Sequence, residues 1–141
     1  MRQLKLAASA YLAVMAGWVI VHFSEHTLFE DHAEESVEAG GRSALDFFMA
    51  LAFLVAAIAS YLDTRRGAKE SPPPPGWLAS RLFFYLVVLV AIPFFANWFA
   101  SLGHTDDGIL WIYVETMGPL TWGIQAVRIW RGARTPGRVA A

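Results

Sequence analysis

The chain of 141 residues contains no cysteine. This absence excludes disulfides, thiolate-bound metal ions, covalently attached c-type haem and thiol redox chemistry. Charged residues are also scarce, at 16% of the chain, and the formal net charge is -1. Because no global positive field is present to attract phosphates, no nucleic-acid partner is expected. The apolar fraction of 56% excludes a disordered tail.

Long runs without charge or histidine occupy much of the sequence. The three main runs contain 16, 16 and 22 residues, at 6–21, 47–62 and 82–103. A fourth apolar segment, 109–129, is interrupted by Glu115. About 20 residues of α-helix cross a hydrocarbon core of roughly 30 Å. The sequence therefore predicts four membrane-spanning helices, at about 4–23, 44–62, 78–100 and 109–129.

Basic residues are distributed unevenly around these spans. Ten of the 11 Lys and Arg residues flank one side, and Arg42 alone lies on the other. Because loops rich in Lys and Arg stay in the cytoplasm, both termini are predicted to be cytoplasmic. We therefore expect an all-α, integral membrane four-helix bundle, with residues 1–141 forming a single membrane domain. A bacterial cytoplasmic (inner) membrane is the expected location.

The two longer connections differ in composition. The outer loop, 24–43, is acidic and ends at Gly40 and Gly41, a pair typical of a helix stop. Its segment 26–39 has a helix-compatible composition, so either the first helix continues past the membrane or a short amphipathic helix follows it. The cytoplasmic linker, 63–77, contains four consecutive prolines, which favour a stiff polyproline II spacer.

The most specific motif is H-x-x-E-H, formed by His22, Glu25 and His26. On a helix, residues i and i+4 share a face, so the two imidazoles can bind one Cu or Zn ion beside the carboxylate. A further ligand would have to come from elsewhere in the chain, the candidates being Glu30, Asp31, His32, His104 and Glu115. The competing interpretation is a polar rim where the first helix leaves the lipid.

Haem b is disfavoured by the placement of the histidines. Bis-histidine ligation between membrane helices needs axial residues within the bilayer. Only His22 and His104 approach that position, and both lie at the outer margin of the predicted spans.

Glu115 is the second candidate, six residues inside the fourth predicted span. An ionised residue at the centre of a membrane helix costs about 2.5–3.5 kcal/mol, so this side chain should face protein or water. Asn97 and Gln125 are further polar residues within the predicted spans. This set predicts either a proton or cation site or a helix-pairing contact, because polar side chains also hold membrane helices together.

Three functions fit these features. The leading hypothesis is an accessory subunit of a larger respiratory, photosynthetic or oxygenase-type membrane complex, without catalysis of its own. The chain has thin loops and abundant aromatic residues, and its partners would be the lipid bilayer and other membrane subunits. The second is an outer-face Cu- or Zn-binding or redox subunit that uses the H-x-x-E-H segment. The third is a small transporter centred on Glu115.

Overall fold

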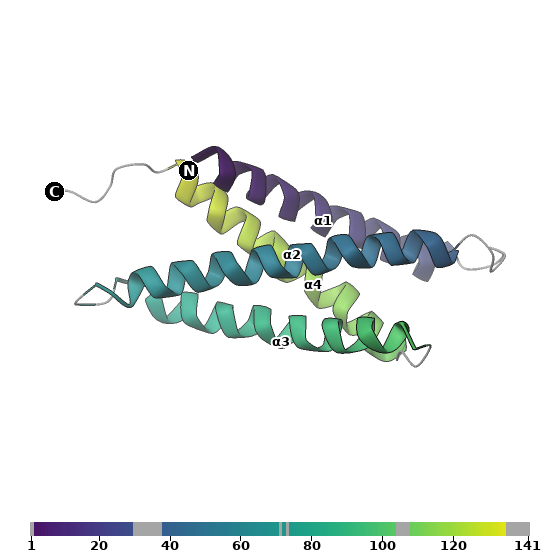
Figure 1. The fold of residues 1–141 in the computed structure, drawn as a ribbon. Coiled ribbons are helices and arrows are strands. Elements are labelled where there is room, and N and C mark those ends of the chain that lie inside the picture. Colours follow the sequence, from purple (N-terminus) through teal and green to yellow (C-terminus); the bar gives the residue numbers. More distant parts are fainter. Residues whose placement is uncertain (1, 30–37, 71, 73, 104–107, 135–141) are drawn as a thin grey trace.

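The computed structural model describes residues 2–29, 38–70, 72, 74–103 and 108–134, and within 25–29 and 38–43 it describes the backbone only. These residues form four α-helices, which confirms the all-α prediction (Figure 1). In chain order the helices are α1 (Arg2–Phe29), α2 (Glu38–Gly67), α3 (Trp77–Ser101) and α4 (Gly108–Arg134).

Three of the helices, α1, α2 and α3, are long and apolar enough to cross a membrane. This finding is consistent with the predicted integral membrane protein. α4 does not belong to this group, because Glu115 and Gln125 lower the hydropathy of its apolar segment. That α4 also spans the membrane stays a prediction.

The helices pack as two central and two flanking elements. Among the described residues, α2 and α4 each contact all three other helices, whereas α1 and α3 do not touch. α4 crosses behind α2 in Figure 1, and its C-terminal end lies beside the N-terminus of α1. Two hydrogen bonds join α1 to α4 and to α2. Ser9 Oγ donates to the carbonyl oxygen of Ala126 at 2.8 Å, and the Tyr11 hydroxyl donates to that of Phe48 at 2.7 Å.

An aromatic cluster lies at the contact of α2, α3 and α4. The ring of Phe53 lies 5.0 Å from that of Phe94 and 4.8 Å from that of Trp122, centroid to centroid, and all three residues are fully buried. Gly118 makes room for them, because a Cβ there would lie 3.2 Å from the Trp122 ring. Lipid is as apolar as this core, so close packing rather than water exclusion stabilises such contacts in a membrane.

The helices extend beyond the predicted spans. α1 continues over 24–29 and α2 already begins at Glu38, so both enter the predicted outer loop. The expectation that Gly40 and Gly41 stop a helix was wrong, since both lie inside α2. A glycine costs a helix only about 1 kcal/mol, which the long helix that follows can outweigh.

The linker between α2 and α3 closes around Trp77. Its indole nitrogen donates to the carbonyl oxygen of Thr64 at 3.2 Å. A Cβ on Gly67 would lie 2.5 Å from Trp77 Cδ1, so this close approach requires glycine. Gly76, at φ 88°, occupies the left-handed region just before α3. Residues 71 and 73 lie outside the described part of the chain, so the polyproline II conformation stays a prediction.

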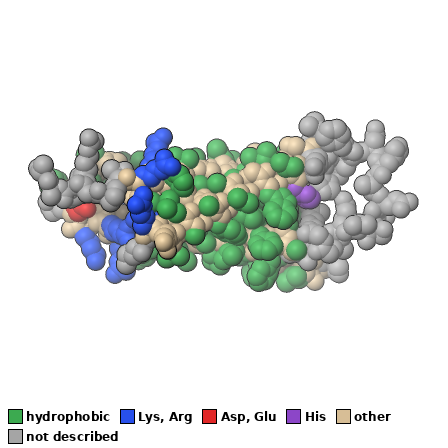
Figure 2. Space-filling view, turned by 90° about the horizontal axis from the view of Figure 1, so that it is seen from above, with side chains coloured by type: hydrophobic (Ala, Val, Ile, Leu, Met, Phe, Trp, Pro, Cys, Tyr) green, Lys and Arg blue, Asp and Glu red, His purple; other side chains and the backbone are tan. Residues whose placement is uncertain are grey.

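Charge and hydrophobicity divide the surface into zones. Figure 2 shows Lys and Arg side chains gathered at one end and hydrophobic side chains over the middle. We call the first zone the basic end; it includes Lys5, Arg66, Arg81 and Arg128. Large apolar side chains are exposed on every helix, among them Val14, Ile58, Leu89 and Ile112. Such a belt suits contact with lipid.

Candidate functional sites

The H-x-x-E-H motif lies entirely on α1. Because this helix runs without a break to Phe29, the backbone places His22, Glu25 and His26 at the helical spacing that the motif requires. His22 is half-buried, whereas the side chains of Glu25 and His26 lie outside the described residues. The described side chains include no group of three His, Cys, Asp or Glu residues that could hold a metal ion.

The further metal ligands are not tested by the structure. Glu30, Asp31, His32 and His104 lie outside the described residues, and Glu115, the fifth candidate, lies on α4. The Cu or Zn site therefore stays a prediction that rests on the motif and on the continuity of α1.

Glu115 lies in a groove between α1 and α4. The groove has a volume of about 530 Å³, and the glutamate is half-buried in it. Its walls are otherwise mostly apolar and include Ala16, Ile20 and Phe23 on α1 and Pro119, Leu120 and Gly123 on α4. The neighbouring Thr116 hydroxyl donates to the carbonyl oxygen of Ile112 at 2.8 Å, so it is already engaged in its own helix.

Asn97 and Gln125 are buried inside the bundle, but at different levels. Asn97 follows Phe94 by one turn on α3, and the Phe94 ring lies 6.0 Å from that of Trp111 on α4. Gln125 is fourteen residues beyond Trp111, which corresponds to about 20 Å along a helix. The two side chains therefore occupy separate layers of the interior rather than one site.

Gln125 also shares its face of α4 with an unpartnered indole. Both side-chain amide atoms of Gln125 and the indole nitrogen of Trp122 are buried without a hydrogen-bond partner among the described residues. Sequence reasoning identified Gln125 but missed Trp122. The spacing of the two residues could have indicated that Trp122 lies beside Gln125, because residues i and i+3 lie on the same helix face.

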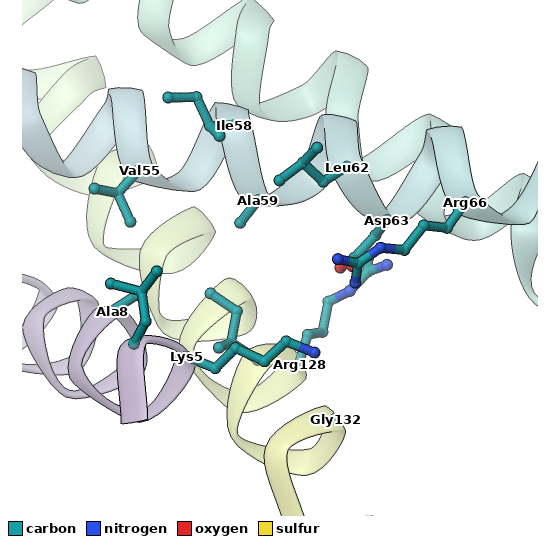
Figure 3. A pocket seen from close by; sticks show the side chains of 12 residues that line it. Lys5, Ala8, Val55, Ile58, Ala59, Leu62, Asp63, Arg66, Arg128 and Gly132 are labelled. Carbon is teal, nitrogen blue, oxygen red and sulfur yellow. The ribbon is translucent and has the colours of Figure 1, made fainter. Parts of the chain in front are cut away.

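A second feature that sequence reasoning missed is a pocket at the basic end. Lys5 on α1, Asp63 and Arg66 on α2, and Arg128 on α4 line it, and its volume is about 400 Å³. We call it the basic pocket. Figure 3 shows the four charged side chains directed toward the same region from three helices. The sequence showed only that these cations share one end of the bundle; it did not show which helices adjoin.

Arg128 is the most firmly held of these cations. Its Nη2 atom donates to Ser80 Oγ at 2.6 Å, and its guanidinium carbon lies 4.8 Å from the centre of the Phe83 ring. Both partners belong to α3, so Arg128 joins α4 to α3 beside the pocket. Its planar guanidinium retains further N–H donors for an anion.

Comparisons of this chain with protein-family models, with curated proteins and with solved structures found no match.

Proposed function

We propose that this chain is an accessory subunit of a larger membrane complex, to which α1 joins it by packing against a partner's helix. The observation that carries the proposal is a face of small, exposed residues on α1. Ala10, Ala13 and Gly17 follow one another at helical spacing, and all three are exposed. A Cβ added to Gly17 would meet nothing within 4 Å.

The opposite face of α1 is occupied by its own bundle. Leu12, Met15 and Val19 are buried there against the other helices. The outward face therefore contributes nothing to internal packing. In membranes, small residues four apart, such as Ala13 and Gly17, let a second helix backbone approach closely, which increases van der Waals contact.

Lipid alone does not require small residues at this position. On α3 most outward positions carry large side chains, among which Leu89, Ile92 and Phe99 are each about 60% exposed, and its exposed alanines do not follow one another at helical spacing. These side chains suit acyl chains, whereas a flat strip on α1 suits a neighbouring helix. α1 exposes large side chains as well, among them Val14 and Trp18, so its distinguishing feature is the run of small residues beside them, and this run supports a protein partner for α1.

The experiment introduces bulk on this face. Ala13→Ile and Gly17→Ile should shift the protein from a large assembly to a small particle when membranes are solubilised in mild detergent and separated by size. Ala96→Ile is the matched control, because Ala96 is exposed on α3. If the wild type already migrates alone, or if Ala96→Ile releases it equally, the proposal fails.

The orientation belongs to the same proposal. We propose that the protein lies in a bacterial inner membrane with its basic end facing the cytoplasm, because ten of the 11 basic residues lie on one side of the predicted spans. A tag on the C-terminus should be labelled by an impermeant reagent only after the cells are opened. Labelling of the tag on intact cells would show that the C-terminus lies outside the cell and would contradict this orientation.

A Cu- or Zn-binding subunit is the second candidate. It is favoured by the unbroken course of α1 through His22 and His26, which keeps the two residues one turn apart. Purified wild type should retain Cu or Zn after dialysis, and the His22→Ala/His26→Ala double variant should lose it. Ser24→Ala on the same helix should leave the metal content unchanged. Equal metal in the wild type and the double variant would remove this candidate.

A further inference from the structure

The basic pocket combines a charged region with an apolar wall. Lys5, Arg66 and Arg128 face one carboxylate, Asp63, which leaves an excess of two positive charges among the lining residues. All three cations act electrostatically on Asp63, so they lie near one another rather than on separate surfaces. An anion entering the pocket would therefore meet a net positive field.

The rest of the lining is aliphatic. Leu4 on α1, Val55 and Ile58 on α2, and Ile129 on α4 form its wall. Leu4 and Ile58 are largely exposed, so this wall continues onto the outer surface of the bundle. A small soluble anion would make no use of such a surface, whereas a hydrocarbon chain would cover it.

From this arrangement we infer that the basic pocket binds one anionic phospholipid, with the headgroup phosphate at Lys5 and Arg66 and an acyl chain against the wall between α1 and α2. Basic pockets between membrane helices are suited to anionic headgroups. Charge-assisted hydrogen bonds from Lys and Arg to phosphate are the strong component of such binding. Arg128, fixed by Ser80 and Phe83, supplies a preorganised positive charge behind them. This binding site goes beyond the proposed role as an accessory subunit.

The lipid class is tested by native mass spectrometry of delipidated full-length protein. Phosphatidylglycerol, whose headgroup is anionic, and phosphatidylcholine, whose headgroup carries no net charge, are titrated separately with identical acyl chains, so that the two lipids differ only in the headgroup. Each of the two cations near an anionic headgroup should contribute about fivefold, which predicts about 25-fold weaker phosphatidylglycerol binding by Lys5→Gln/Arg66→Gln. The wild type should prefer phosphatidylglycerol, and the double variant should bind the two lipids alike.

The matched control is Arg2→Gln/Arg65→Gln. It removes the same charge from exposed residues of the same two helices that do not line the pocket. We expect it to retain the preference for phosphatidylglycerol. An equal loss in both double variants would overturn the inference, because it would indicate attraction to the whole basic end rather than to the pocket.

Two further arms separate a lipid from a free phosphate. Ala59→Phe keeps every charge but fills the apolar part of the pocket, so it should weaken phosphatidylglycerol binding. Inorganic phosphate at millimolar concentration should fail to displace the lipid. Full binding by Ala59→Phe, displacement by phosphate, or equal binding of the two lipids by the wild type would each overturn the assignment. The unfolding midpoint of each variant confirms that it is folded.

Discussion

Replacing Gln125 by methionine should stabilise the bundle. The side chain is 0% exposed, and neither its Nε2 nor its Oε1 atom has a hydrogen-bond partner among the described residues. Burying a polar group without a partner costs about 1–3 kcal/mol. Methionine has nearly the same length and shape but no comparable donor or acceptor, so it removes this cost with little repacking.

The expected gain is about 1–3 kcal/mol, which raises the ratio of folded to unfolded protein by roughly 5- to 150-fold. The gain falls at the lower end of this range where the glutamine also lacks a partner in the unfolded helices within a membrane, because its cost is then present in both states. A gain above this range is not expected, because the substitution leaves the buried indole nitrogen of Trp122 without a partner among the described residues.

The assay is reversible unfolding by SDS in mixed micelles, followed by circular dichroism. Gln3→Met is the matched control, since it makes the same chemical change at an exposed position on α1. It should alter the unfolding free energy by less than about 0.5 kcal/mol. If Gln125→Met instead lowers stability by more than about 1 kcal/mol, the amide has a stabilising partner in the native protein and the reasoning is refuted.

Three further predictions concern packing, the linker and the groove. Gly118→Ala should change the unfolding free energy by less than about 1 kcal/mol in the same assay, because the tight contact of its Cβ with the Trp122 ring opposes the better helix propensity of alanine; a loss above about 2 kcal/mol would show that the ring cannot yield. Trp77→Phe removes the hydrogen bond to the carbonyl of Thr64 and should cost about 0.5–1.5 kcal/mol, whereas a gain in stability would contradict this role. Proteoliposomes of the wild type and Glu115→Gln should leak protons equally under the proposed role as an accessory subunit; a leak that only the variant loses would favour a transporter.

The course of the helices could largely be predicted from the sequence. Uncharged runs located α1, α2 and α3, and the apolar segment around Glu115 located α4, because length and hydropathy are local properties. The helix ends were harder to predict. Charges mark where a chain leaves lipid, but a helix can continue beyond that point, as α1 does past His22 to Phe29.

To predict the interior sites, one would need to know how each helix is rotated about its own axis, and the sequence does not give this. Gln125 could be recognised as a polar residue in an apolar segment, but the burial of Trp122 beside it depends on which face of α4 meets α2 and α3. In the same way, Lys5 and Arg128 are far apart in the chain and share a pocket only because α1 and α4 adjoin. The H-x-x-E-H motif could be recognised from local spacing alone, without knowing how the helices pack.

The bond from Ser9 to the carbonyl of Ala126 joins residues 117 positions apart. At typical rates of translation, the ribosome adds the second residue roughly 6–20 s after the first. During that interval α1 has no access to α4, its main neighbour, and of the other described helices only α2 can contact it. A chain that ends before Ala126 would leave α1 without this contact, so α1 should dock fully only after most of α4 has been made.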